Sequence, residues 1–236
     1  MEGAMHRWMV LAMLGLTACG GDSAVPDAAT DEQLAILRDF DTVALDSRDS
    51  VEVRRGEGFA VRVEGPAERR AGLILRRDGH ILRISRSEGG LWAVDRDAAR
   101  IVVTMPVIAA ATLSGSGDIT IDQAGDPFTG TLGGSGDMTI GQLQGGRTTL
   151  TVAGTGTIAA AGSVRSLTLT IVGSGDIDVR QVQAADAAVS ITGSGDIKAA
   201  IDGPARVSLT GSGSAMLGRG ARCTVNRVGT GEAHCG

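Results

Sequence analysis

Hydrophobic and polar residues alternate through the second half of the chain in short runs, and a recurring tripeptide separates these runs. The tripeptide is glycine, then serine or threonine, then glycine, and it occurs seven times at intervals of 18 to 20 residues. Its first glycines are Gly115, Gly134, Gly154, Gly173, Gly193, Gly211 and Gly229. A fixed period of this length is typical of a solenoid, in which each coil buries its apolar face only against its neighbours.

The residues around each tripeptide fall into columns when the seven copies are aligned on the first glycine. The residues two positions before it are Leu113, Leu132, Val152, Ile171, Ile191, Leu209 and, as the exception, Arg227. Those four positions after it are Ile119, Met138, Ile158, Ile177, Ile197, Ala215 and Ala233. A hydroxyl column three positions before it contains Thr112, Thr131, Thr151, Thr170, Ser190 and Ser208. This alternation has the period of a β-strand and directs the apolar set inward and the hydroxyls outward.

These columns predict an all-β protein, a right-handed single-stranded β-helix with 18 to 20 residues in each coil. Stacking at the strand spacing of about 4.8 Å places like side chains above one another in ladders. Side chains fill the interior of so small a coil, which leaves no room there for a ligand. The glycines suit sharp corners, because glycine adopts positive φ at little cost.

The first residues indicate where the protein is sent. Residues 1–18 combine a basic start with a short apolar run, as a secretory signal peptide does. Leu16-Thr17-Ala18-Cys19 matches the lipobox of bacterial lipoproteins, which implies that Cys19 becomes the lipid-modified first residue. Gly20 after that cysteine favours the outer membrane. Residues 21–32 are small, polar and acidic, and we expect a flexible tether over residues 19–38.

Two further cysteines, Cys223 and Cys235, lie 12 residues apart in the last coil. A pair of cysteines in an exported chain predicts a disulfide, because the envelope permits oxidation. Closing so short a loop stabilises the fold by about 3 kcal/mol in the chain-entropy model. A zinc site that includes His234 is the alternative, although too few ligands stand at a useful spacing.

Residues 39–106 differ from the repeats in composition. They contain arginine-rich alternating segments, which are typical of half-buried strands. Three of them are Ser50–Arg54, Phe59–Val63 and Ile81–Ser85. We expect irregular opening coils that cap the rod and continue its core. Both signs of charge are present, so a solvated outer face is favoured over a nucleic-acid site.

The lipobox is followed by arginine-rich strands, by the segment Ile101–Pro106, and then by Leu113–Asp118 and its repeated copies. In this order of its segments the chain resembles the head GIN domain family. That family is associated with auto-transporter adhesins of the bacterial envelope. The resemblance extends over residues 39–236 and implies a β-helical domain there, with the regular repeats in 107–236. It implies exposure at the envelope and carries over no catalytic residue.

A partial aspartate column three positions after the first glycine is the candidate for metal binding. Its members are Asp118, Asp137, Asp176 and Asp196, and other residues replace them in the remaining copies. Such columns are similar to calcium-binding nonapeptide repeats, although the spacing here differs. The simpler interpretation is that these carboxylates satisfy backbone N–H groups at the corners.

We also considered a polysaccharide-active β-helical enzyme, but the chain lacks tyrosine and offers no clustered catalytic residues. A phosphate-binding loop is excluded because the tripeptide lacks the lysine and the helix that such a loop needs. The net charge of −5 gives no reason to expect nucleic acid as a partner. We therefore expect a non-catalytic envelope lipoprotein without a cofactor. It would meet the membrane through its lipid anchor and bind an envelope protein or polysaccharide as an adhesion or scaffold module.

Overall fold

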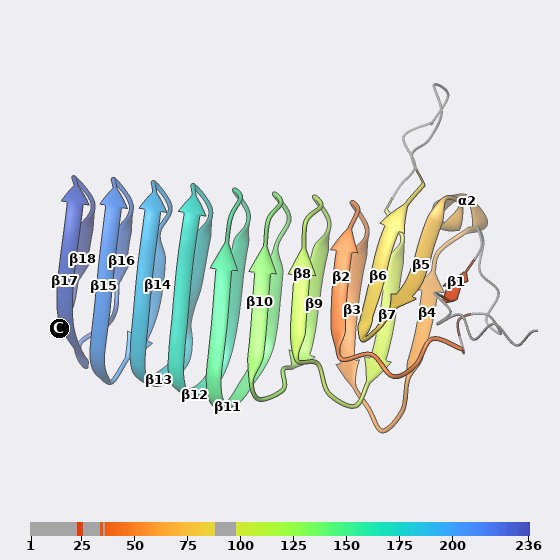
Figure 1. The fold of residues 1–236 in the computed structure, drawn as a ribbon, viewed down its shortest axis with the longest axis horizontal. Helices are drawn as coiled ribbons and strands as arrows, with labels where there is room; N and C mark the ends of the chain where they lie inside the picture. The colour runs from red at the N-terminus through yellow and green to blue at the C-terminus, as the bar shows by residue number, and fades with distance from the viewer. Residues whose placement is uncertain (1–22, 26–33, 35, 88–97) are drawn as a thin grey trace, which may run out of the picture.

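The computed structural model describes residues 23–25, 34, 36–87 and 98–236, which form a straight rod of stacked β-strands (Figure 1). The regular part contains β8 (Ala110–Leu113), β9 (Asp118–Gln123), β10 (Phe128–Leu132), β11 (Met138–Val152), β12 (Thr157–Gly173), β13 (Asp176–Gly193), β14 (Ile197–Ile201), β15 (Gly203–Gly211), β16 (Ser214–Met216), β17 (Ala221–Gly229) and β18 (Glu232–His234). The N-terminal part contains β1 (Ser23–Val25), β2 (Thr42–Asp46), β3 (Ser50–Arg55), β4 (Ala60–Glu64), the short helix α2 (Ala67–Arg70), β5 (Leu73–Asp78), β6 (Ile81–Arg86) and β7 (Arg100–Met105).

The regular part is the predicted β-solenoid. In Figure 1 the chain rises along the near side, turns at a Gly-Ser/Thr-Gly corner and descends on the far side while it advances towards the C-terminus. That path is right-handed, as the sequence predicts. Neighbouring coils pair in parallel with like residues in register, for example Ile158 with Ile177 and Thr151 with Thr170. The backbone of every inner coil is thereby bonded on both sides.

The core is a single column that runs through all the coils. The apolar positions before and after each corner face inward from the two sides, and residues such as Leu132, Ile171 and Ile177 have no exposed surface. Burial of a Leu or Ile side chain stabilises the fold by about 1.5 to 3 kcal/mol. Because each inward residue packs on its equivalents above and below, the coils stabilise one another.

Each first glycine of a corner lies directly above a backbone carbonyl of the neighbouring coil. A Cβ at Gly134 would stand 1.8 Å from the carbonyl oxygen of Gly115, and one at Gly193 would stand 2.1 Å from that of Gly173. Only the last four of the seven have positive φ, the property from which the sequence analysis explains them. The close stacking of the coils is the reason that applies to all seven.

The order of the coils along the rod differs from their order in the sequence. The coil formed by β2 and β3 lies between the β6–β7 coil and the β8–β9 coil, and it pairs in parallel with both. Figure 1 shows this as an orange coil between yellow and green ones. The opening strands thus continue the core, as expected, but the coil that comes first in the sequence is an inner coil of the rod.

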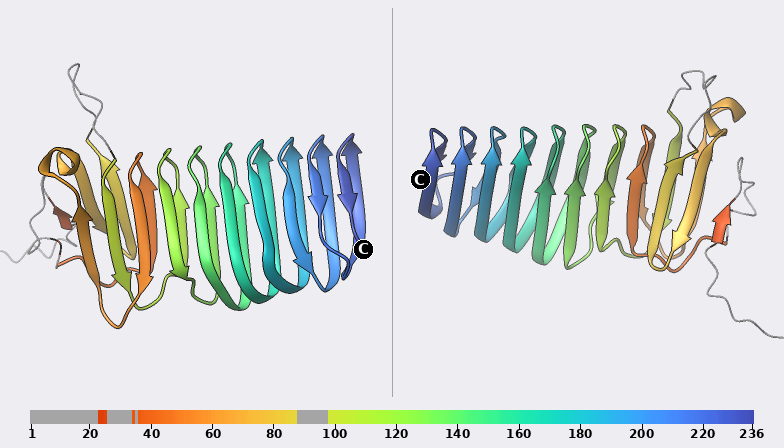
Figure 2. Two further views of the ribbon diagram at one scale, coloured as in Figure 1. Left: turned by 180° about the vertical axis from the view of Figure 1, so that it is seen from behind. Right: turned by 45° about the horizontal axis from the view of Figure 1, so that its top comes forward.

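Antiparallel strands cover the N-terminal end of the rod. β4 pairs with β7, β5 pairs with β6, and β1 pairs with β5 (Figure 2). Leu34 and Leu37, which the sequence analysis assigns to the tether, are buried in the core beside Phe40. The packed part of the chain therefore begins before Asp39.

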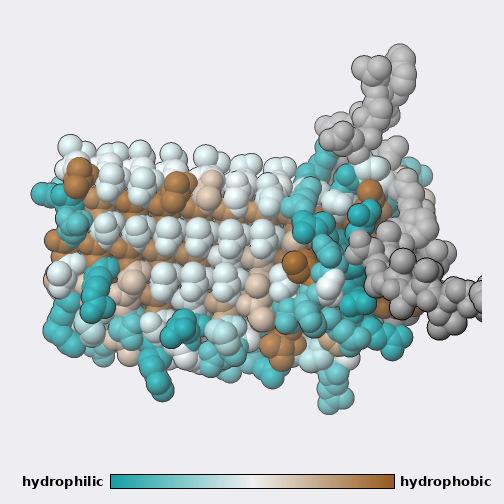
Figure 3. Space-filling view, in the orientation of Figure 1, coloured by the Kyte–Doolittle hydropathy of each residue, from teal (hydrophilic) through white to brown (hydrophobic). Residues whose placement is uncertain are grey.

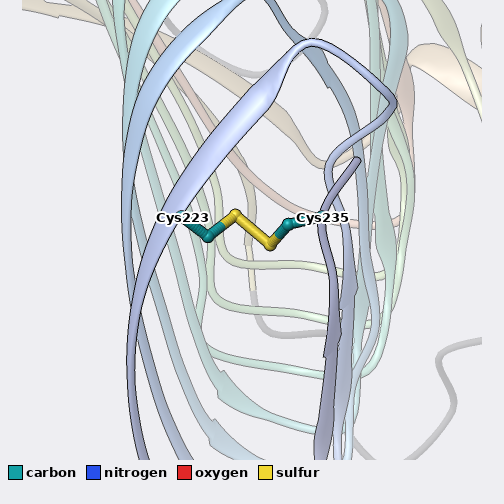
Figure 4. Close-up of a disulfide and its surroundings, with 2 residues drawn as sticks. All are labelled: Cys223 and Cys235. Atoms are coloured by element: carbon teal, nitrogen blue, oxygen red, sulfur yellow. A yellow bond between two sulfur atoms is a disulfide. The ribbon is translucent and has the colours of Figure 1, made fainter.

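The C-terminal end of the rod is closed in a different way. The predicted disulfide between Cys223 and Cys235 crosses the interior of the last coil, with its Cα atoms 6.1 Å apart (Figure 4). Arg227, the exception in the apolar column, donates a hydrogen bond from Nη1 to the carbonyl oxygen of Gly231 at 3.1 Å. Within the part of the chain that the structure describes, β17 pairs only with β15, and Val225 is 46% exposed although it occupies an inward position.

Candidate functional site

The aspartate column forms hydrogen bonds between successive coils. Oδ1 of Asp118 accepts the backbone N–H of Asp137 at 3.0 Å, and Oδ1 of Asp137 accepts that of Thr157 at 2.9 Å. The second pair repeats the arrangement, since Asp176 accepts the N–H of Asp196 at 2.9 Å. Each carboxylate therefore satisfies the amide of the equivalent residue one coil further along.

The column is interrupted at Thr157, and the backbone compensates there. The N–H of Asp176 donates to the carbonyl oxygen of Gly156 at 3.1 Å instead of to a carboxylate. Asp196, at the end of the second pair, accepts both the N–H of Ser214 at 3.0 Å and its hydroxyl at 2.7 Å. This geometry supports the simpler interpretation of the column, that of backbone partners at the corners.

The described ranges contain no group of three or more histidine, cysteine, aspartate or glutamate side chains able to hold a metal ion. His234 lies 3.2 Å from Glu232 and next to the disulfide-bonded Cys235. The thiols that the zinc alternative would need are therefore joined to each other. The residues of that alternative come together, but as a disulfide beside an exposed contact between His234 and Glu232.

The near side of the rod in Figure 1 carries three outward-facing columns, which we call the hydroxyl face. Its first column is Ala110, Thr129, Thr149, Thr168, Ala188, Arg206 and Thr224; its second is Thr112, Thr131, Thr151, Thr170, Ser190, Ser208 and Asn226; its third is Ser114, Gly133, Ala153, Val172, Thr192, Thr210 and Val228. Figure 3 shows these columns as pale rows that run along the rod, with brown rows of apolar residues between them. The face is flat because the underlying strands are parallel and in register.

A shallow groove of about 400 Å³ runs along the hydroxyl face between its first and second columns. It crosses four coils. Its floor consists of Leu169, Val189, Val207 and Val225. Its two walls consist of Thr168, Ala188, Arg206 and Thr224 on one side and Thr170, Ser190, Ser208 and Asn226 on the other. The groove thus has an apolar floor and predominantly hydroxyl-bearing walls.

The opposite side of the rod carries charges. Asp178 and Arg180 form a forked ion pair there, with Nη2 of the arginine 2.6 Å from Oδ2 of the aspartate. The hydrogen bonds from Arg180 hold the pKa of Asp178 below its ordinary value. Because the arginine side chain is 65% exposed, water weakens this pair, and we assign it little weight in stability.

One buried charge cluster lies at the junction between the N-terminal part and the regular coils. Asp49, whose side chain has no exposed surface, accepts hydrogen bonds from Nε of Arg86 at 2.8 Å, from the hydroxyl of Ser47 at 2.7 Å and from the N–H of Ala99 at 2.7 Å. Arg86 also donates hydrogen bonds to the carbonyl oxygens of Ala71 and Arg69. The cluster thereby joins β3, β6, β7 and the segment between α2 and β5.

The charge state of Asp49 follows from these partners. Burial alone raises the pKa of its carboxyl group, but the hydrogen bonds from Arg86, Ser47 and Ala99, together with the arginine charge, outweigh it and lower the pKa. Asp49 is therefore ionised at neutral pH, and its hydrogen-bonding capacity is taken up inside the protein. We interpret the cluster as a structural one, because every partner is another part of the fold.

This cluster was not predicted from the sequence, and the coil to which it belongs was expected only as one of several irregular opening coils. In that coil the register places Ser47 and Asp49 over the two glycines of the Gly115 corner, so no tripeptide marks it. The signal that remained was the pair of apolar columns, since Leu45 and Val51 stand two positions before and four positions after Ser47. Cys19, the predicted lipidation site, lies outside the described residues.

The comparisons with known proteins place this arrangement among solved structures. A model of the family described as "Putative auto-transporter adhesin, head GIN domain" matches residues 39–218. No curated protein matches the chain. A putative adhesin from Bacteroides fragilis is similar with a TM-score of 0.69 and 16% identity over 84% of this chain and 93% of its own. A putative lipid-binding protein from Parabacteroides distasonis has a TM-score of 0.62 and 17% identity, over 84% of this chain and 93% of its own. A putative adhesin from Parabacteroides merdae has a TM-score of 0.53 and 14% identity, over 85% of this chain and 93% of its own.

Proposed function

The chain belongs to the head GIN domain family, and we propose that it is a non-catalytic, adhesin-like lipoprotein of the bacterial cell envelope. The observation that carries this proposal is the form of the molecule. A rod whose coils are bonded to one another by backbone ladders presents a long, fixed surface, and most of its hydrogen-bonding capacity is used in holding itself together. Because such a surface is preorganised, it loses little conformational entropy when a partner binds.

The sequence supports attachment of this rod to a membrane through Cys19. Within the described residues no helix is long and apolar enough to cross a bilayer. The lipobox supplies the anchor in this proposal, and Gly20 directly after the cysteine supports delivery to the outer membrane. The disulfide between Cys223 and Cys235 agrees with export, because such bonds persist in oxidising compartments.

The arrangement of the ionisable groups supports a non-catalytic role. The buried carboxylate of Asp49 is paired with Arg86, and the corner aspartates accept backbone amides. His80 lies in the turn between β5 and β6 at one end of the rod, and His234 lies in β18 at the other. No acid, base and nucleophile are therefore grouped in the described coils as acyl transfer or glycoside cleavage requires.

Fractionation and protease treatment of intact cells test this proposal. We expect the wild-type chain to incorporate labelled fatty acid, to sediment with outer membranes and to be cleaved by protease added to intact cells. The variant Cys19→Ser is the control, and we expect it to lose the label and to be released from the membrane. A wild-type chain that is protected until the cells are lysed would show a periplasmic protein and refute surface adhesion. Membrane retention of the control would refute the lipid anchor.

A further inference from the structure

The hydroxyl face and the opposite side of the rod differ sharply in charge. Of the outward positions in the three columns of the hydroxyl face, all of which the structure describes, only Arg206 is charged. The opposite side carries the corner aspartates, the pair of Asp178 and Arg180, and Lys198. The next outward column on the same strands, which lies outside the hydroxyl face, carries both signs of charge at Arg147, Asp186 and Arg222. A charged polymer would find few counter-charges within the three columns themselves, so the chemistry of this face fits an uncharged partner.

The groove on this face narrows the class of partner further. It runs along the rod axis and presents an apolar floor between walls that carry hydroxyl groups. At this floor Leu169, Val189 and Val207 turn their side chains into the core, and Val225 is exposed at the end of the groove. A pyranose ring has the complementary character, because its two faces consist of C–H groups and its edges of hydroxyls. The coils repeat at about 4.8 Å, so a polymer with a short, constant repeat meets the same surroundings at every step.

Other occupants fit this surface less well. A peptide strand that extends a sheet needs free backbone N–H and C=O groups at an edge. Apart from β17 at the end of the rod, the strands below the groove have their backbone groups paired with the coils on both sides, for example β13 with β12 and β15. A bilayer surface is bound by exposed apolar and basic side chains. On this face only Val172 and Val228 are large apolar residues that point outward and are exposed.

We propose that the groove along the hydroxyl face binds an uncharged, unbranched polysaccharide, with the chain of the polysaccharide parallel to the rod axis. This inference rests on the proposed adhesin-like function and names both the binding face and the chemical class of its partner. The C–H faces of the sugar rings pack on the floor, and their hydroxyls exchange hydrogen bonds with Thr170, Ser190 and Ser208. Because the groove contains no aromatic ring, each sugar contributes little, and binding strength comes from the number of coils engaged.

Co-sedimentation with insoluble neutral polysaccharides tests the proposal. The probes are amorphous cellulose, chitin and an insoluble mannan, with soluble alginate as an anionic competitor. The test variant is Thr170→Lys with Ser190→Lys, which places two charged chains on the wall of the groove. The control variant is Thr120→Lys with Thr139→Lys, which adds the same charge at exposed positions on the opposite side. All chains are first compared by thermal unfolding, so that binding is measured on folded protein.

We expect the wild-type chain and the control variant to sediment with at least one neutral polysaccharide, and the groove variant to bind about tenfold more weakly. Alginate is expected not to compete. Failure to bind all three probes, equal binding by both variants, or competition by alginate would overturn the proposal. A face-to-face dimer in sedimentation velocity, abolished only by the groove variant, would also overturn it, because the face would then belong to a second copy of the chain.

The outcome can be separated from that of the proposed function. Binding of the wild-type chain to intact cells or isolated envelopes is measured in parallel with the same two variants. If the chain binds envelopes and the groove variant binds equally well, the adhesin-like function stands and the assignment of the groove fails. If the wild-type chain binds neither envelopes nor polysaccharide, both fail.

Discussion

Adjacent glycines at one corner allow the stacking of the coils to be tested with two single substitutions. Gly134 packs against the neighbouring coil, where an added Cβ would stand 1.8 Å from the carbonyl oxygen of Gly115. Gly133 is exposed, and the nearest atom to its added Cβ is 3.9 Å away. Neither has positive φ, so the two positions differ in space and not in backbone conformation. Gly133→Ala is therefore a matched control for Gly134→Ala.

The expected magnitude follows from the displacement that the new methyl group requires. Ordinary contact begins at 3.4 Å, so the Ala side chain at position 134 must separate the two coils locally by about 1.6 Å. That movement breaks the hydrogen bond from Ser135 N–H to the carbonyl oxygen of Gly115 and strains the bond from Asp137 N–H to Asp118. Together with the overpacking we expect a loss of about 2 to 4 kcal/mol in the free energy of unfolding.

The control is expected to change stability in the opposite direction. Ala at position 133 reduces the freedom of the unfolded chain without a clash, which stabilises the fold by about 0.4 to 1 kcal/mol. The next coil already has Ala153 at the equivalent position.

The assay is urea unfolding followed by far-UV circular dichroism, on the chain from Gly20 onward so that no lipid is attached. With the m-values usual for small proteins, Gly134→Ala should lower the midpoint by about 1 to 2 M urea. The midpoint of Gly133→Ala should stay the same or rise. Equal midpoints for the two variants would refute the argument that contact between coils selects glycine at the corners.

Three further predictions concern the charged and covalent links. Asp49→Asn should lower the free energy of unfolding by about 3 kcal/mol at neutral pH, because it leaves Arg86 buried without its partner; urea unfolding measures this, and an unchanged midpoint would contradict it. The pKa of Asp49 is lower in the folded chain than its ordinary value of 3.8, so its stabilising contribution is present above that pH and is lost as the pH falls through the folded-state pKa; unfolding midpoints below pH 4 should fall less steeply in the Asn variant. Replacing Cys223 and Cys235 by serine should cost about 3 kcal/mol and increase hydrogen exchange first in β17, and unaltered protection there would show that the disulfide does not hold the last coil. Asp137→Ala should cost about 1 kcal/mol, while excess chelator should leave the melting temperature of the wild-type chain unchanged; a lower midpoint with chelator would restore the calcium alternative.

The regular coils could be predicted because their signal is local and repeated. Columns such as Leu113, Leu132 and Val152 recur at one period, and parallel in-register stacking converts that period directly into structure. The disulfide followed from a different argument, because Cys223 and Cys235 are a pair in a chain that is expected to be exported. The exception at Arg227 also has a structural meaning, because in the described structure this side chain is exposed and donates a hydrogen bond to the carbonyl oxygen of Gly231.

The N-terminal part could be predicted only as strands, and not in their order. Alternation shows that Val51 and Val53 face inward, but it does not show which strands lie on either side of β3. The buried pair of Asp49 and Arg86 was equally hidden, because Asp49 lies in the polar run of residues 46–50 and Arg86 ends a segment in which polar and apolar residues alternate. The hydroxyl column from Thr112 to Ser208 was recognised in the sequence as outward-facing. Their groove was not, because its depth depends on the packing of Leu169 and Val189 below the surface.

The position of the β2–β3 coil has a consequence for how the rod is made. This coil pairs on one side with β6 and β7 and on the other with β8 and β9, all of which follow it in the chain. Its contact from Arg55 N–H to Asp122 spans 67 residues. During synthesis or export from the N-terminus, β2 and β3 therefore have at most one of their two neighbouring coils until residue 123 has emerged. The pairing of this coil on both sides is completed late. Every coil after it stacks on one that is already in place, so the rod grows in one direction, towards the disulfide.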